Sequence, residues 1–128
     1  MSLTVVSWNV LADAYIKPEY YPHVDPALLV AGARTQAIVE QVVTFKAEVV
    51  CLQEVEPALV AALKARGLTV HYARKRGRPD GCAIVSTLPA GDLRTVTFSD
   101  GAPARADSGH VALFATIADM TIATTHLR

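Results

Sequence analysis

A short, uninterrupted apolar run over residues 48–55 most limits what this chain can fold into. The run reads Glu48-Val49-Val50-Cys51-Leu52-Gln53-Glu54-Val55, and its central residues do not alternate between polar and apolar side chains. This pattern is typical of a strand that is covered on both faces, as in sheets flanked by helices. The sequence therefore predicts an α/β fold with layers on either side of this strand.

Helices and further strands are predicted around this run. Asp25 and Pro26 fit the N-cap and first position of a helix extending to about residue 46, and the apolar residues behind them recur at helical spacing. A second helix is predicted over residues 57–66, because Leu59 and Leu63 are four residues apart and Gly67 suits a helix end. The predicted strands cover residues 3–10, 48–55, 68–74, 81–86, 93–99, 110–117 and 121–127.

Composition limits the classes of partner. The 128 residues correspond to one domain, and 12 basic against 12 acidic residues give no net charge, so attraction to phosphate has to be local. Because no window approaches the roughly 18 apolar residues of a membrane span, we expect a cytoplasmic protein without a membrane partner. Cys51 and Cys82 lie in apolar runs and are expected to be reduced core thiols, with a disulfide or a reactive or metal-binding role as the alternatives.

Two polar side chains end otherwise apolar predicted strands. Asn9 closes the first strand and Glu54 closes the run that opened this section. If these strands are neighbours, the amide and the carboxylate meet at one edge of the sheet, where ligands bind in α/β folds. A carboxylate beside an amide is a hard-oxygen site that suits Mg²⁺, which needs only one or two protein carboxylates. A solvated Glu54 and a turn-forming Asn9 are the alternatives.

Two further features could contact phosphate. His126 follows the last predicted strand and could donate a hydrogen bond to a phosphate oxygen. Arg74, Lys75, Arg76 and Arg78 form a basic turn between two predicted strands, which is either a solvated hairpin tip or a contact for a phosphate backbone. A structural or exposed histidine is the alternative for His126.

Four blocks in order resemble one known family. Ser7-Trp8-Asn9-Val10-Leu11-Ala12-Asp13, Cys51-Leu52-Gln53-Glu54-Val55, Asp80-Gly81-Cys82-Ala83-Ile84 and Ala123-Thr124-Thr125-His126-Leu127 are similar to blocks of the endonuclease/exonuclease/phosphatase superfamily. The first and third blocks resemble the branch that contains the poly(A)-tail deadenylases. The resemblance implies a DNase-I-like, four-layer α/β sandwich of two sheets with helices outside each. It also implies hydrolysis of phosphate esters with Mg²⁺ or Mn²⁺.

The resemblance assigns roles to the residues already singled out. Glu54 matches the metal-binding glutamate of the family, and Asn9 matches an asparagine beside the metal and the phosphate. His126 matches a histidine that contacts the scissile phosphate. These roles fit the chemistry, since amide and imidazole donors stabilise oxygens whose negative charge grows in the transition state.

The family pattern continues beyond these four blocks with an Asp-x-Asn block, a further aspartate and a terminal Asp-His pair, and none of these occurs in residues 1–128. We therefore interpret residues 1–128 as the N-terminal half of the domain, containing one sheet and its helices. The inner face of that sheet is then expected to be apolar and uncovered, so that a complementary C-terminal half or a second chain would have to cover it.

The sequence supports two functional hypotheses. The first is a metal-dependent phosphodiesterase, most simply a nuclease acting on RNA or single-stranded nucleic acid, to which this chain contributes part of the active site. On this hypothesis the isolated chain is expected to be inactive. The second is a non-catalytic half-domain that acts as a structural or binding module.

Overall fold

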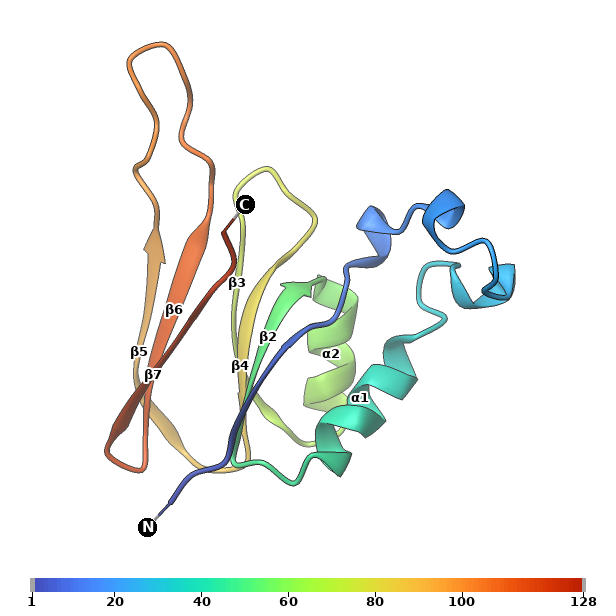
Figure 1. The fold of residues 1–128 in the computed structure, drawn as a ribbon. Coiled ribbons are helices and arrows are strands. Elements are labelled where there is room, and N and C mark those ends of the chain that lie inside the picture. Colours follow the sequence, from blue (N-terminus) through green and yellow to red (C-terminus); the bar gives the residue numbers. More distant parts are fainter. Residues whose placement is uncertain (1, 128) are drawn as a thin grey trace.

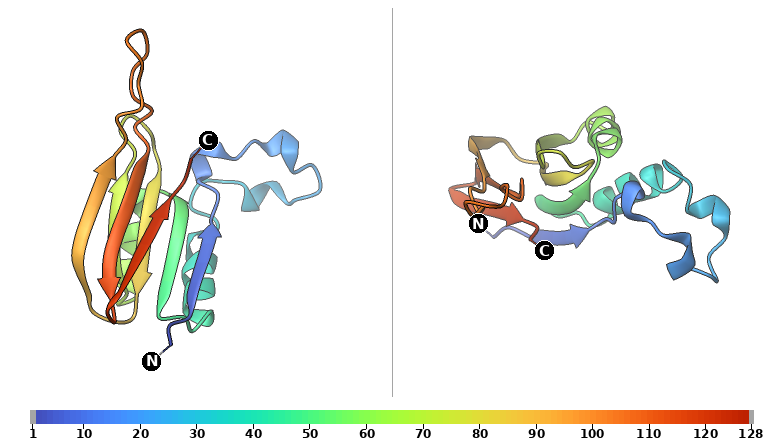
Figure 2. Two further views of the ribbon diagram at one scale, coloured as in Figure 1. Left: turned by 60° about the vertical axis from the view of Figure 1, so that its left-hand side comes forward. Right: turned by 90° about the horizontal axis from the view of Figure 1, so that it is seen from above.

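Residues 2–127, which a computed structural model describes, are arranged in three layers. Helices form one outer layer, a four-stranded sheet lies in the middle, and a three-stranded sheet forms the other outer layer (Figure 1, Figure 2). A long segment between the first strand and the first helix projects to one side of these layers. The predicted α/β class is confirmed.

The first four strands of the chain form the middle sheet, in the order β1-β2-β4-β3. Strand β1 runs parallel to β2, whereas β4 is antiparallel to both of its neighbours. Because β1 and β2 are parallel and adjacent, their carboxyl ends lie at the same edge of the sheet. The bounds of its strands are β1 Val5–Asn9, β2 Val49–Val55, β3 Thr69–Arg74 and β4 Gly81–Ser86.

Two helices, α1 (Thr35–Thr44) and α2 (Pro57–Ala65), cover one face of this sheet. Alternate residues of β2, Val50 and Leu52, point into the core beneath them. The helices contribute buried residues at the expected helical spacing, among them Ile38 and Leu63. In the described part of the chain, neither helix is long and apolar enough to cross a membrane.

The opposite face of the four-stranded sheet is covered by a second sheet of the same chain, with the order β5-β6-β7. Val49 and Cys51 of β2 pack there in one buried cluster with Leu113 and Ile117. The expectation of a single sheet with an uncovered inner face is therefore wrong, because the last three strands turn back over the first sheet instead of extending it. The bounds of these strands are β5 Ala90–Thr97, β6 Val111–Ile117 and β7 Met120–Thr125.

The helix predicted from Pro26 to about Lys46 is also corrected. Asp25 does cap a helical turn, since its carboxylate accepts a hydrogen bond from the backbone N–H of Ala27, but this 3-10 turn ends at Leu28. The helix proper starts only at Thr35. Gly32 intervenes with a φ of +84°, a left-handed conformation that ends a right-handed helix.

Both cysteines are free and buried, which confirms the expected core thiols. Burial raises the pKa of the Cys82 thiol to about 11. Burial likewise raises the pKa of Cys51, although its hydrogen bond with Thr124 acts in the other direction. Both side chains therefore serve as small apolar groups between the two sheets.

The packing of the second sheet on the first gives a stability prediction. Leu113 is 0% exposed between the sheets, so Leu113→Ala should lower the free energy of unfolding by about 2 to 5 kcal/mol through lost burial and a cavity. Leu93→Ala is the matched control, because Leu93 lies on β5 and is 51% exposed; its effect should stay within about 0.5 kcal/mol. Urea denaturation of both variants measures the difference, and equal losses would contradict the two-sheet core.

Candidate active site

Asn9 and Glu54 meet at the carboxyl edge of β1 and β2, as the sequence predicted for neighbouring strands. The Asn9 side-chain amide donates a hydrogen bond of 2.6 Å to Glu54 Oε2, and the backbone N–H of Ala12 donates one of 3.3 Å to Oε1. The amide oxygen of Asn9 accepts from the backbone N–H of Leu11 at 2.9 Å. Glu54 is therefore held through both oxygens, and Asn9 is held by the turn that follows it.

The backbone at this edge adopts unusual conformations. Glu54 has a φ of +57° and Leu11 a φ of +60°, and neither is a glycine. At Glu54 the register of β2 against β4 shifts between Leu52 and Val55, which marks a bulge that turns the side chain out of the alternation. Left-handed conformations at such residues cost about 1 to 3 kcal/mol each and persist only where the surroundings impose them. The Glu54 carboxylate is thus carried by a residue whose backbone is strained.

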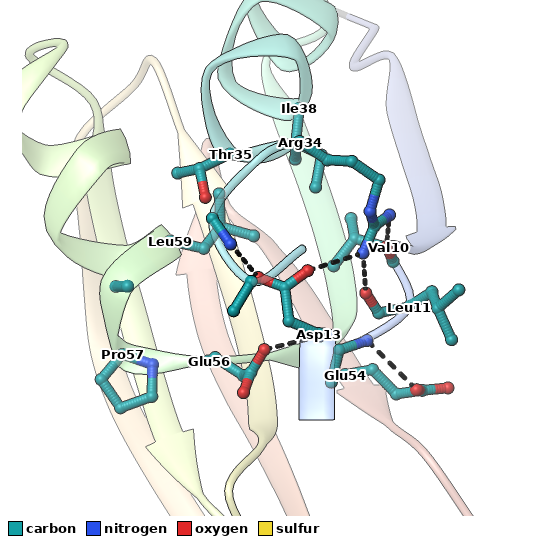
Figure 3. Close-up of a pocket in the computed structure, with 14 residues that line it drawn as sticks. Val10, Leu11, Asp13, Arg34, Thr35, Ile38, Glu54, Glu56, Pro57 and Leu59 are labelled. Atoms are coloured by element: carbon teal, nitrogen blue, oxygen red, sulfur yellow. Dashed lines mark hydrogen bonds and ion pairs between the residues drawn. The ribbon is translucent and has the colours of Figure 1, made fainter. Parts of the chain in front are cut away.

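Arg34 holds the strained segment after β1 in place (Figure 3). Its guanidinium donates to the carbonyl oxygens of Val10 at 3.0 Å and Leu11 at 2.5 Å, and it pairs with Asp13 Oδ1 at 3.2 Å. Asp13 in turn accepts from the backbone N–H of Gly32 at 2.8 Å. These bonds fix residues 10–13 and so fix the N–H group of this segment that contacts Glu54.

The contacts of Arg34 with residues 10–13 are called the Arg34 clamp. A cavity of about 410 Å³ lies beside this clamp, and Glu54 forms part of its wall. Arg34, Asp13 and Glu56 add two further carboxylates and a guanidinium to the lining. The backbone N–H of Asp13 donates to Glu56 Oε1 at 2.6 Å. Asn9 and His126 do not line this cavity.

The basic turn between β3 and β4 is present, but its members differ in exposure. Arg74, Arg76 and Arg78 are exposed, as expected for a solvated turn or a phosphate contact. Lys75 is only 2% exposed, so the expectation that it belongs to the exposed basic surface is wrong. Its Nζ lies 3.1 Å from Asp80 Oδ2 and 3.4 Å from His126 Nδ1. The side chain points inward because a buried carboxylate at the other end of the turn neutralises it.

Asp80 is the buried partner that holds this arrangement. It is 0% exposed, and its second oxygen accepts from the Tyr15 hydroxyl at 2.5 Å. Burial by itself raises the pKa of Asp80, but the hydrogen bonds from Tyr15 and Lys75, together with the lysine charge, lower it below the ordinary value. The next residue must be glycine, because a Cβ on Gly81 would lie 1.9 Å from the carbonyl oxygen of Ala73.

His126 reaches the same edge from the second sheet. It follows β7 directly and is partly buried beside Lys75. Two residues earlier, Thr124 accepts a hydrogen bond of 3.1 Å from the Gln53 side-chain amide, and Gln53 precedes Glu54 on β2. The predicted residues therefore form two groups at one end of the layers: Asn9 with Glu54, and His126 with Lys75. Figure 1 shows the end of β7 next to the β3–β4 turn.

The free acceptor positions of the Glu54 carboxylate are suited to bind a divalent cation. A carboxylate has about four acceptor positions, and hydrogen bonds occupy two of them, which leaves lone pairs for a hard cation. Asn9 presents its nitrogen to Glu54, so in this arrangement it orients the carboxylate. Among residues 2–127 no group of three or more histidine, cysteine or acidic side chains is placed to hold a metal.

Several residues of this site were not singled out from the sequence. Arg34 and Asp13 lie in segments without a regular apolar repeat, so no periodicity marked them. The aspartate at 13 did end the first family block, and the aspartate at 80 began the third, which was the only signal that either belonged to the site. Tyr15 contacts Asp80, which is 65 positions away, and Arg34 contacts Asp13, which is 21 positions away.

The described chain is thus a two-sheet α/β domain that brings a carboxylate, an amide and an imidazole to one end of its layers. The chain belongs to the endonuclease/exonuclease/phosphatase family, which it matches over residues 6–122. The family predicted from the four blocks is thereby confirmed.

Relatives in this family are similar to the chain over part of their length. Carbon catabolite repressor protein 4 homolog 4 of Arabidopsis thaliana is 36% identical over 71% of this chain and 23% of the relative. Human 2',5'-phosphodiesterase 12 is 38% identical over 52% of the chain and 12% of the relative. The chain thus spans less than a quarter of the length of these two relatives.

Solved structures agree with the fold over nearly the whole chain. The crystal structure of ANGEL2, a 2',3'-cyclic phosphatase, in complex with adenosine-2',3'-vanadate superposes with a TM-score of 0.78 and 25% identity, covering 98% of this chain and 41% of that chain. The human Nocturnin catalytic domain with bound sulfate superposes with a TM-score of 0.68 at 21% identity, covering 97% and 49%. The three layers therefore correspond to about half of these larger domains.

The Arg34 clamp gives a stability prediction. Arg34→Met should lower the free energy of unfolding by about 2 to 3 kcal/mol, because it leaves carbonyl oxygens of a strained segment without charge-assisted hydrogen bonds. Arg66→Met is the matched control, since Arg66 forms an exposed ion pair with Glu40 and its loss should cost less than about 1 kcal/mol. Chemical denaturation measures both, and equal effects would contradict the clamp.

The buried Lys75–Asp80 pair gives a pH prediction. Asp80 has a lowered pKa in the folded chain, so the unfolded chain binds more protons in acid and stability is lost as the pH falls below about 4. The double variant Lys75→Met/Asp80→Asn removes both charges and should show a shallower loss of unfolding free energy below that pH. Asp80→Asn alone should cost about 3 to 5 kcal/mol at neutral pH, because it leaves a buried ammonium unpaired. Denaturation at several pH values tests this, and parallel pH curves for the unaltered chain and the double variant would refute it.

Proposed function

We propose that this chain supplies part of the active site of a divalent-metal-dependent phosphodiesterase of the nuclease type, acting on RNA or single-stranded nucleic acid. The observation that carries the proposal is Glu54, a carboxylate held by Asn9 at 2.6 Å and by a backbone N–H, at a strained bulge on the edge where strands end. Family membership over residues 6–122 supports the reaction class. The names of the relatives, a 2',5'-phosphodiesterase and a 2',3'-cyclic phosphatase bound to an adenosine-vanadate, support a nucleotide phosphoester as substrate.

Each residue has a defined task in this proposal. Glu54 would hold Mg²⁺ or Mn²⁺ through its free lone pairs, and Asn9 would orient the carboxylate and lie beside the phosphate. When bound, such an ion neutralises phosphate charge and stabilises the leaving oxygen. His126 would donate a hydrogen bond to a phosphate oxygen, and the exposed Arg74, Arg76 and Arg78 would contact the backbone of the nucleic acid.

A second candidate function is a non-catalytic binding module. One observation favours it for this chain alone: within residues 2–127 no group of three or more histidine, cysteine or acidic side chains is placed to hold a metal. On this reading the exposed arginines of the β3–β4 turn would bind nucleic acid, and Glu54 would serve no chemistry.

Hydrolysis of a short oligoadenylate with Mg²⁺ separates the two functions. In the full-length protein, purified with any polypeptide that stays bound to it, Glu54→Gln should lower the rate at least about 100-fold, because it removes the charge that holds the metal. Glu40→Gln is the matched control, as Glu40 lies on α1 in an exposed ion pair, and it should leave the rate unchanged. RNA binding without hydrolysis in the unaltered protein, or equal rates for Glu54→Gln and the control, would contradict the enzymatic proposal.

A further inference from the structure

We propose that Lys75 is a positioning residue that fixes the His126 imidazole with its proton on Nε2. The inference deepens the proposed function, on which its catalytic meaning rests. Three contacts carry it: Lys75 Nζ lies 3.4 Å from His126 Nδ1 and 3.1 Å from Asp80 Oδ2, and the Tyr15 hydroxyl lies 2.5 Å from Asp80 Oδ1. Together these residues form a network around a buried ion pair that the sequence did not indicate.

The direction of the lysine–histidine hydrogen bond follows from the chemistry of the two groups. A lysine ammonium has three N–H donors and no acceptor, so in this contact only the ring nitrogen can accept. Nδ1 of His126 must then be unprotonated, because two N–H groups cannot share one hydrogen bond. In the resulting neutral ring the proton resides on Nε2.

The charge of Lys75 is maintained by its surroundings. Lys75 is 2% and Asp80 0% exposed, and a buried ammonium is stable only beside a carboxylate that is itself hydrogen-bonded. Both oxygens of Asp80 are used, one by Lys75 and one by Tyr15. The ammonium is thereby held at a fixed point from which it faces the imidazole.

This network joins the two groups of the site. Tyr15 ends the short 3-10 turn Asp13–Tyr15, and Ala12 at the start of that turn donates its N–H to Glu54. Asp80 and Lys75 belong to the β3–β4 turn, and His126 follows the second sheet. The carboxylate and the imidazole are therefore set relative to each other through one buried aspartate.

The tautomer decides what His126 can do. Histidines that act as bases or metal ligands commonly donate Nδ1–H to a carboxylate or carbonyl oxygen, which leaves Nε2 free to accept. Here an ammonium faces Nδ1, so Nε2 carries the proton and can donate to a phosphate oxygen. Lys75 thus assigns His126 the role of a hydrogen-bond donor and excludes that of a general base through Nε2.

Nitrogen NMR of the imidazole rings tests this assignment directly on the chain. The chain has four histidines, and His126→Gln identifies the signals of His126 by their loss. At pH 8 we expect His126 to show a protonated Nε2 and an unprotonated Nδ1. A protonated Nδ1, or an average of both tautomers, would overturn the proposal whatever the variants below show.

Substitutions then test the part played by Lys75. Lys75→Met alone would strand a buried carboxylate, so the double variant Lys75→Met/Asp80→Asn is used, with the exposed Lys64→Met as the matched control. The double variant should shift the His126 signals toward a mixture of tautomers, and the control should leave them in place. Unchanged signals in a folded double variant would overturn the role of Lys75. Because this readout needs no catalysis, its failure is distinct from a failure of the Glu54 hydrolysis experiment.

Discussion

Burial of β2 on both faces is the constraint on which the rest of the structure depends. Val50 and Leu52 pack under the helices, while Val49 and Cys51 pack against the second sheet, so this one strand joins both cores. A strand covered in this way cannot slide without disrupting close packing against both neighbouring layers at once. The residues at its carboxyl end are therefore placed with little freedom, which is what a catalytic carboxylate requires.

The packing of β2 allows strained backbone conformations to persist at the site. Glu54 and Leu11 both adopt left-handed conformations, and neither would be favoured in an isolated peptide. The buried strand on one side and the Arg34 guanidinium on the other hold the two segments together. A carboxylate that is oriented before substrate arrives does not have to be ordered during the reaction, so the cost of strain is met in folding.

The family relationship accounts for the layers that this chain shares with larger solved domains. The chain shares its layers with about half of a larger catalytic domain, and its site residues occupy one edge of those layers. In the function proposed above, that edge supplies a metal-binding carboxylate and a donor imidazole, and the Lys75–Asp80 pair contacts the imidazole. The proposed chemistry therefore depends on this chain for orientation as well as for individual ligands.

Periodicity and strand-end residues are local signals, so the sequence was enough for the α/β class, the approximate strands, the family and the choice of Asn9 and Glu54. That these two side chains meet depended on β1 and β2 being neighbours, which the fold decides. The sequence did not determine that the last three strands form a second sheet, since both sheets have the same local pattern and differ only in what they pack against. Nor did it show that Lys75 is buried, because its neighbours in the chain are exposed arginines. Only the tertiary structure decided these points, since burying an ammonium requires a carboxylate and a hydroxyl that arrive from elsewhere in the fold.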